Sequence, residues 1–390
     1  MSTTPRNPFN KDNDDRSRVK NGQEQGADKI NRFRSFAFTG TTRQLFGIYF
    51  VNILLSLVTL GIWIPWARVR NRRFFYGNTR ALDNGFDYLA TGFALFKGWI
   101  LVLVAILTFY IAPYFSSDLP YIQESLSVLF VLIYPWALTK SMYFNARNLA
   151  WRDVRFDWKG GYFGAAWYFF IFPLIGILSF GLLIPIMSCK ARQYIVNNYR
   201  FGEAKFEAEL EIGAFYGAAI RTIFTFILLI TIICIASFGL LFLISGNQAT
   251  DTFFDNLMLF MTQDADNMKG YLLYFIPILF IASFYATGAF YHALTRNIMV
   301  NSLRLEGIAK FRSELSGSKL AWIIISNSLA IMLSFGLLWP WAQVRRYRYL
   351  VESTRLRPSD NIDSIVDTQS QAGHSIGDAA SDAGGIELQF

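Results

Sequence analysis

The sequence feature that most constrains this chain is an apolar run that ends in Gly and Pro and leads directly into cations. It occurs at residues 58–67, at 333–342 and, in a third copy, at 178–187. The cations that follow are Arg68, Arg70, Arg72 and Arg73 in the first copy, Arg345, Arg346 and Arg348 in the second, and Lys190 and Arg192 in the third. Two copies also carry Trp beside the Pro. Since Trp favours headgroup depth and cations favour the cytoplasm, each run is typical of a segment that leaves a membrane.

The composition favours a polytopic membrane protein. Of the 390 residues, 53% are hydrophobic and only 16% are charged, which is too apolar for one soluble domain. In a soluble protein the formal charge of +8 would suggest a nucleic-acid partner. Here the basic residues lie beside apolar runs, so we interpret them as topology signals and expect no nucleic-acid partner.

Groups that commonly carry catalysis are scarce. The two cysteines, Cys189 and Cys234, lie in or at the end of apolar segments and offer no disulfide framework or thiolate metal cluster. The two histidines, His292 and His374, are too few for a catalytic triad or a histidine-based metal site. We find no Gly-rich phosphate loop or metal-ligand spacing. The sequence therefore predicts no catalytic, cofactor-binding or metal-binding residues, and we expect that the protein is not an enzyme.

The chain divides into three regions. Residues 1–34 are polar and residues 358–390 are acidic, and this composition predicts two disordered tails. Residues 35–357 form the predicted membrane domain, which contains seven apolar segments. Three of these are the Gly–Pro runs. The other four are predicted to span the membrane, at about 94–115, 122–139, 214–245 and 271–294.

The apolar segments belong to a repeat, whose positions are counted from the Pro that closes a run. Five residues after the Pro lies a cation: Arg70, Lys140, Lys190 or Arg345. Thirteen residues after it lies Asn78, Asn148, Asn198 or Ser353. Twenty-one residues after it lies Phe86, Phe156 or Phe206. A Phe-containing segment thus opens each of five predicted modules, near residues 36, 86, 156, 206 and 311, and we expect short cytoplasmic strands or amphipathic elements there.

The charge distribution predicts which side of the membrane each polar stretch faces. The loops at 116–121 and 246–267 lack cations and are predicted to lie outside, whereas the basic stretches, including the C-terminal end at 345–357, are predicted to face the cytoplasm. The three Gly–Pro runs have cations at both ends, which conflicts with a single crossing. A run of about 24 residues is about 36 Å long as a helix, enough for one crossing of the roughly 30 Å core but not for two. Two interpretations stay open, a kinked single-pass helix and a re-entrant segment that returns to the same side.

Either interpretation needs a break in each run. The candidate break positions are Thr59, Gly61 and Pro65 in the first run, Ser179, Gly181 and Pro185 in the second, and Ser334, Gly336 and Pro340 in the third. Gly and Pro loosen a helix, and a hydroxyl can satisfy the backbone groups that the break frees.

Two asparagines form a candidate intramembrane polar pair. Asn52 and Asn327 both lie thirteen residues before the Pro of their run, whereas the middle copy has Phe172 and Pro173 there. An amide in hydrocarbon is costly unless it is paired. Each amide either caps a helix break or bridges two helices, or the pair lines a substrate path between repeats.

The arginines behind the first and last runs have two interpretations as well. Arg68, Arg70, Arg72, Arg73, Arg345, Arg346 and Arg348 either determine topology or also bind anionic lipid headgroups. The lipid bilayer, with its anionic headgroups, is therefore the only partner class that the sequence indicates.

Several of these residues also carry a resemblance. The combination of Phe38-Thr39-Gly40 with Leu45-Phe46, Thr59 to Ile62, Pro65-Trp66-Ala67 and Asn78-Thr79 resembles the YjgN-like family of bacterial inner-membrane proteins, a domain of unknown function. The resemblance covers roughly residues 33–357 and departs at Ile186-Met187, where the other copies have Trp-Ala. It implies a multi-pass protein of the bacterial cytoplasmic membrane, and it brings no activity, cofactor or catalytic residue.

Together these observations predict an all-α polytopic inner-membrane protein built of quasi-repeats. The repeats, the broken runs and the Asn pair favour a transporter or channel-like protein for a small or lipidic solute. The alternative is a non-transporting membrane scaffold or lipid-interacting protein, and an integral-membrane enzyme ranks third. A continuous polar path would favour transport, whereas a centre sealed by Phe and Leu would count against it.

Overall fold

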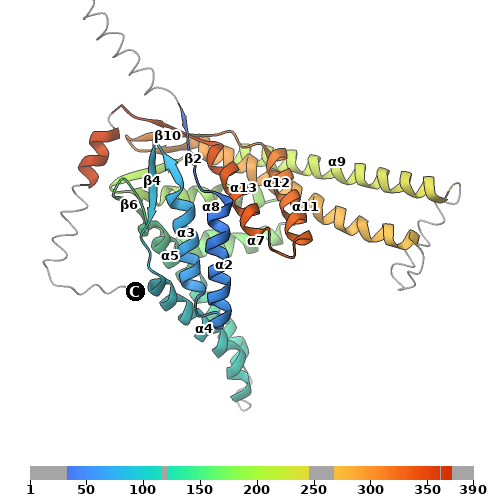
Figure 1. Ribbon diagram of the computed structural model, residues 1–390, viewed down its shortest axis with the longest axis horizontal. Coiled ribbons are helices and arrows are strands. Elements are labelled where there is room, and N and C mark those ends of the chain that lie inside the picture. Colours follow the sequence, from blue (N-terminus) through green and yellow to red (C-terminus); the bar gives the residue numbers. More distant parts are fainter. Residues whose placement is uncertain (1–32, 116–120, 246–267, 361, 371–390) are drawn as a thin grey trace, which may run out of the picture.

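The computed structural model describes residues 33–115, 121–245, 268–360 and 362–370. It consists of a β-sheet that closes on itself and of helices that leave one end of this sheet (Figure 1). In Figure 1 the sheet lies at the upper left, α4 and α5 extend downward, and α9 and α11 extend to the right. The two longest helical hairpins therefore diverge from a common base.

The sheet is antiparallel and follows the spatial order β1-β11-β10-β9-β8-β7-β6-β5-β4-β3-β2. Its strands are β1 (Arg34–Ser35), β2 (Ala37–Phe38), β3 (Thr79–Ala81), β4 (Asn84–Tyr88), β5 (Leu149–Trp151), β6 (Val154–Trp158), β7 (Tyr199–Phe201), β8 (Ala204–Ala208), β9 (Leu303–Leu305), β10 (Ala309–Ser313) and β11 (Thr354–Pro358). The two ends of the order, β1 and β2, are separated along the chain by Phe36 alone. The Phe36 N–H donates to the Thr354 carbonyl at 3.0 Å, so this segment joins both edges and the sheet forms a barrel.

The helices come in pairs between barrel strands. They are α2 (Thr42–Val58), α3 (Ile64–Gly77), α4 (Gly92–Phe115), α5 (Ile122–Arg147), α6 (Tyr162–Ala166), the π-helical η1 (Trp167–Ile171), α7 (Phe172–Leu178), α8 (Ile184–Asn197), α9 (Ile212–Ser245), α11 (Met268–Ser302), α12 (Gly317–Leu333) and α13 (Trp339–Glu352). The π turn precedes Pro173, which has no N–H to offer the carbonyl one helical turn back.

Five units of strand, helical hairpin and strand make up the described chain. They are β2–α2–α3–β3, β4–α4–α5–β5, β6–α6–η1–α7–α8–β7, β8–α9–α11–β9 and β10–α12–α13–β11. Because each hairpin starts and ends on a barrel strand, the helices of all five units leave from one end of the barrel, which we call the base. The turns that join one unit to the next lie at the opposite end.

The residue thirteen after the Pro ends the returning helix. Asn78, Asn148 and Asn198 each donate a side-chain amide to the carbonyl four residues earlier, at 2.8 Å in all three cases. The Ser353 hydroxyl does the same at 2.5 Å. The backbone carbonyls of these four residues accept a hydrogen bond from the end of the incoming strand, at 2.8 to 3.1 Å. This repeat position therefore closes the base of each hairpin.

The prediction of an all-α protein is wrong, because the short strands of the five units pair into one closed sheet. Each strand is two to five residues long, so its own pattern carries little signal. Its partners lie in other units, and β1 pairs with β11 from the far end of the chain. Strand formation here depends on pairing and burial, which are properties of the assembled barrel.

A ring of five phenylalanines, one from each unit, fills the barrel. They are Phe36, Phe86, Phe156, Phe206 and Phe311. Successive ring centroids along this series lie 6.4, 6.4, 6.1 and 6.2 Å apart. A barrel of more than eight strands has a wide interior, so large side chains are needed to close it.

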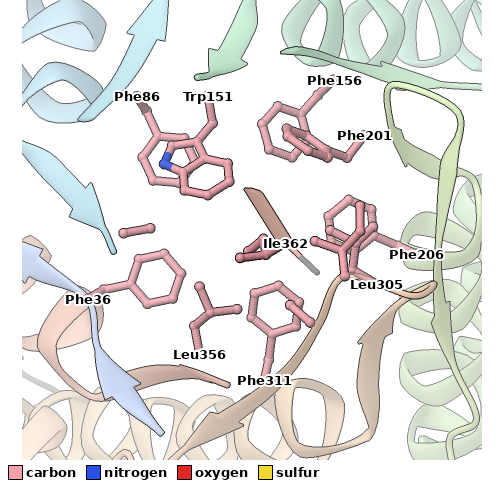
Figure 2. Close-up of a pocket in the computed structure, with 13 residues that line it drawn as sticks. Phe36, Phe86, Trp151, Phe156, Phe201, Phe206, Leu305, Phe311, Leu356 and Ile362 are labelled. Atoms are coloured by element: carbon pink, nitrogen blue, oxygen red, sulfur yellow. The ribbon is translucent and has the colours of Figure 1, made fainter. Parts of the chain in front are cut away.

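A helix over residues 362–370 closes the barrel end that carries the turns. Ile362 and Val366 from this helix are buried in the same cluster as the phenylalanine ring, and Figure 2 shows Ile362 among the residues that line the interior. Arg152, in the β5–β6 turn, forms ion pairs with Asp363 at 2.5 Å and with Asp367 at 3.7 Å. The predicted disorder of the acidic tail therefore does not hold for residues 362–370, because two apolar side chains find a buried site there. Residues 1–32 and 371–390 lie outside the described residues.

Within the described parts of the chain, four helical segments are long and apolar enough to cross a membrane: Gly92–Ala112, Ile122–Arg147, Ile212–Ser237 and Ile278–Ser302. They coincide with the four predicted spans. The loops that we predicted to lie outside, 116–121 and 246–267, fall outside the described residues apart from Tyr121.

The helices of neighbouring units pack into a closed ring at the base. α3 packs on α4, α5 on α6, α8 on α9, α11 on α12, and α13 returns to α2. Farther from the barrel, α4 and α5 make no extensive contact with α9 or α11 in the described parts of the chain. The long hairpins are thus separate arms and do not form a common bundle.

Candidate functional site

The three Gly–Pro runs fold as helical hairpins with nearly identical turns. In the first, α2 ends at Val58 and α3 begins at Ile64. Gly61 has a φ of 89°, and its counterparts Gly181 and Gly336 have 85° and 88°. These are left-handed values that favour glycine, so the glycines predicted as break positions lie at the turns.

The predicted hydroxyls satisfy the backbone of these turns. The Oγ of Thr59, Ser179 and Ser334 each accepts a hydrogen bond from the N–H four residues later, at 3.0, 3.1 and 3.0 Å. Each hydroxyl also donates to a carbonyl of the preceding helix. Pro65, Pro185 and Pro340 each lie in the first turn of the returning helix, where a missing N–H costs nothing.

Both ends of each Gly–Pro hairpin lie on the same side of the structure, because the strands that flank the hairpin meet in the barrel. In the first unit Ala37 pairs with Arg80, and the Thr39 N–H donates to the Asn78 carbonyl at 2.9 Å. Of the two interpretations, the hairpin agrees with a re-entrant segment and excludes a kinked single-pass helix. The presence of cations at both ends of each run follows from this geometry.

The tips of the three hairpins present bare apolar side chains. Leu60, Phe180 and Phe335 are 92%, 98% and 97% exposed, and each has a φ near 50° that turns it away from its own hairpin. The neighbouring Ile177, Leu178, Leu333 and Leu337 are also exposed. Apolar patches of this kind on a soluble surface mark sites of contact with a membrane or another protein.

The candidate polar pair is not brought together. Asn52 and Asn327 are 5% and 6% exposed, and each bonds within its own hairpin. The Asn52 amide oxygen accepts from Arg70 at 3.2 Å, and the Asn327 amide oxygen accepts from Arg345 at 3.0 Å. Each Asn therefore bridges the outgoing and returning helices of its own hairpin. In terms of the repeat, the residue thirteen before the Pro accepts a hydrogen bond from the residue five after it.

Five of the seven candidate headgroup cations donate side-chain hydrogen bonds within the protein, and three of these hold the base together. Arg72 donates to Tyr88 at 2.7 Å and to Asn145, and Arg73 donates to the carbonyl of Ala90 at 2.9 Å. Arg348 donates to the Gly40 carbonyl at 3.0 Å, which ties the last unit to the first. Among the described residues, only Arg68 and Arg346 of this set donate no hydrogen bond.

Sequence reasoning missed a group of tyrosines near these arginines. Tyr76 stacks on Tyr88 with ring centroids 5.7 Å apart, and the Tyr347 hydroxyl lies 3.0 Å from that of Thr79. Burial raises the pKa of Tyr76, Tyr199 and Tyr347, so these hydroxyls stay protonated. No local pattern identifies them, because their strands and helices meet only in the closed ring.

The barrel interior is apolar. It holds a cavity of about 50 Å³ whose lining consists of apolar side chains (Figure 2). Space without polar partners does not hold ordered water. The phenylalanine ring and Ile362 thus leave no polar path along the barrel in the described structure. Nor do the described residues contain a cluster of three or more His, Cys, Asp or Glu side chains arranged to hold a metal ion.

Comparison with known proteins places this architecture in a family. Residues 33–383 match the family described as "Bacterial protein of unknown function (DUF898)". The "Inner membrane protein YjgN" of Salmonella typhimurium is 25% identical over 375 residues, which cover 86% of this chain and 91% of that protein. The protein of the same name from Escherichia coli O157:H7 is 22% identical over 361 residues, covering 83% and 88% of the two chains. No solved structure matches this chain.

Proposed function

Since this chain belongs to the DUF898 family of bacterial membrane proteins of unknown function, we propose that it is a non-transporting, lipid-interacting protein of the inner membrane. In this proposal the barrel and the C-terminus lie in the cytoplasm. Two long hairpins cross the bilayer, and the three Gly–Pro hairpins insert their tips into the cytoplasmic leaflet.

The observation that carries the proposal is the combination of exposed apolar tips with nearby cations. On the returning helices the first cation follows the helix start by four residues in α3 (Arg68) and by six in α8 and α13 (Lys190, Arg345). At 1.5 Å per residue, the cations lie about 6 to 9 Å from the turns. A cation stays near the headgroups, even when it snorkels. The tips are therefore shallow wedges in one leaflet, at the depth that interfacial apolar elements reach.

Transport, which the sequence favoured, has less support. A transporter needs a polar path through the membrane, and its site lies between packed helices. The long hairpins make no extensive contact with one another in the described structure, and the barrel interior is apolar. The Asn residues expected to line a path instead bridge single hairpins. The scarcity of acids, bases and nucleophiles likewise supports a non-enzymatic protein.

Cytoplasmic placement of the barrel rests on charge. The strands carry arginines and lysines that point outward, among them Arg80, Lys205, Arg304 and Lys310, and cationic segments stay on the cytoplasmic side. The helix over residues 362–370 docks on this barrel, which supports the proposal that the C-terminal region lies on the same side.

Depth measurement on single-cysteine variants tests the proposal. In a background without Cys189 and Cys234, a spin label or fluorophore at Phe180→Cys reports the tip, and one at Lys205→Cys reports the barrel exterior. In reconstituted vesicles we expect the tip label to lie roughly 10 Å or less below the headgroups, and the barrel label to be fully accessible to aqueous quenchers. A tip label as accessible to water as the barrel label would overturn the proposal.

A flux assay separates lipid interaction from transport. Vesicles containing the protein should release small anionic, cationic and neutral dyes no faster than empty vesicles. Protein-dependent release that persists across preparations would favour the transport function instead.

A further inference from the structure

Cations from three helices gather at the base of the helical ring. His292 on α11 lies within electrostatic range of Arg192 on α8, of Arg296 on its own helix and of Arg346 on α13. These four residues, with Tyr291, are called the basal cluster below. They come from the third, fourth and fifth units, so no local sequence pattern groups them.

Helix packing accounts for their proximity. Arg192 lies three residues after Cys189, which is buried in a cluster that Met299 of α11 joins. Arg346 lies three residues before Tyr349, which packs with apolar residues of α11 on its other side. Residues three apart share a helix face, so Arg192 and Arg346 approach α11 from two neighbouring directions.

No described residue neutralises the positive charge of the basal cluster. Arg296 donates to the Ser313 hydroxyl at 2.8 Å, to the Leu350 carbonyl at 3.1 Å and to the Thr354 hydroxyl at 2.7 Å, all neutral acceptors. Arg192 and Arg346 donate no hydrogen bond to any described residue. None of the three arginines forms an ion pair within the described ranges. Like charges near one another without a counter-charge repel one another, and the burial of Arg192 and Arg296 adds a desolvation cost.

Two further features fit an anionic ligand. The Tyr291 hydroxyl is buried and has no hydrogen-bond partner among the residues that the structure describes, and it lies within electrostatic range of Arg192. A buried donor without a partner is costly unless a ligand or water satisfies it. His292 and Arg346 are exposed, so a ligand can reach the cluster. Burial lowers the pKa of Arg192, but a guanidinium starts so high that it remains charged.

We propose that the basal cluster binds a phosphate group, carried by an anionic phospholipid or free in solution, through Arg192 and Arg346 with the Tyr291 hydroxyl as an additional donor. A guanidinium fork matches phosphate oxygens in a bidentate manner. His292 lies ten residues before the end of α11, so it is about 15 Å from the barrel along the helix. This depth suits a headgroup, and the lipid source rests on the membrane function proposed above.

Binding to the full-length protein in an uncharged detergent tests the site. The probes are phosphatidylglycerol, zwitterionic phosphatidylcholine and inorganic phosphate, read by native mass spectrometry and by the thermal midpoint. We expect preferential retention of phosphatidylglycerol by the wild type and at least tenfold weaker retention by Arg192→Gln/Arg346→Gln. The control Arg80→Gln removes a cation from the exposed face of β3, where it has no side-chain partner among the described residues, and should bind like the wild type.

The outcomes separate the possibilities. Stabilisation by inorganic phosphate as strong as by phosphatidylglycerol identifies the free anion as the ligand. Equal retention by the wild type and the double Gln variant overturns the site. If the double Gln variant unfolds without ligand, Arg192→Lys/Arg346→Lys serves in its place, because it keeps both charges. The proposed site is also overturned if this folded Lys variant binds phosphatidylglycerol no better than a doubly neutral variant such as Arg192→Met/Arg346→Met. Because tip insertion is measured at Phe180, loss of the basal site alone leaves the proposed function standing.

Discussion

Replacement of Val366 by Asn should release the C-terminal helix from the barrel. Val366 is 1% exposed and lies in the cluster formed with the phenylalanine ring. Burial of such a side chain contributes about 1.5 to 3 kcal/mol, and a buried amide finds no partner among apolar neighbours. The loss raises the fraction of undocked helix by roughly 10- to 150-fold. The solvent-facing ion pairs of Arg152 with Asp363 and Asp367 add too little to compensate.

Hydrogen–deuterium exchange of the backbone amides in residues 362–370 measures this release. Exchange should accelerate by the stated factor in the full-length protein, while the amides of β6 and β8 keep their protection. Thr368→Asn is the matched control, because Thr368 is exposed on the same helix and should exchange at the wild-type rate. Wild-type protection in Val366→Asn would refute the idea that insertion of Val366 holds the helix.

Three further predictions concern the hairpins and the cysteines. Gly336→Ala should lower stability by about 1 to 2 kcal/mol because of its positive φ, whereas Gly288→Ala, in a helix with open space around it, should be neutral or stabilising in the same thermal melt. Asn327→Leu should lower the free energy of unfolding by about 1 to 3 kcal/mol, because it removes a hydrogen-bond partner of Arg345. A double-mutant cycle with Arg345→Met should show coupling between the two positions, and strictly additive changes in stability would contradict the hydrogen bond. Burial raises the pKa of the Cys189 thiol. In a Cys234→Ser background, maleimide should therefore label Cys189 slowly near neutral pH, faster as the pH rises, and rapidly after denaturation. Fast labelling of the folded protein at neutral pH would be inconsistent with a buried thiol.

The repeat spacing in the sequence located much of the architecture. Phe86, Phe156 and Phe206, twenty-one residues after a Pro, lie on the equivalent strands β4, β6 and β8. Gly61 and its two counterparts lie at the turns where a break was expected. Local chemistry determines these features, because a left-handed turn needs Gly and a returning helix tolerates Pro at its start.

The identity of the bonding partners could be foreseen only in part. A buried amide was expected to be paired, but its partner proved to be Arg70 for Asn52 and Arg345 for Asn327. The spacing of eighteen residues between the partners equals the last six residues of the outgoing helix, a five-residue turn and the first seven residues of the returning helix. It has meaning only once the run is known to fold as a hairpin. Five of the seven arginines predicted as headgroup ligands likewise bond within the protein, either inside one hairpin or at the base.

The amino-acid sequence by itself determined the membrane location, the four spans, the break positions and the repeat, since each depends on hydropathy, charge and backbone preference within one segment. Only the tertiary structure decided that the strands close into a barrel, that the C-terminal helix fills its end, and that Arg192, His292 and Arg346 converge. Strands of two to five residues are unstable alone and gain their hydrogen bonds from partners in other units. Closure of the ring is therefore a property of all five units together, and no single stretch of the sequence encodes it.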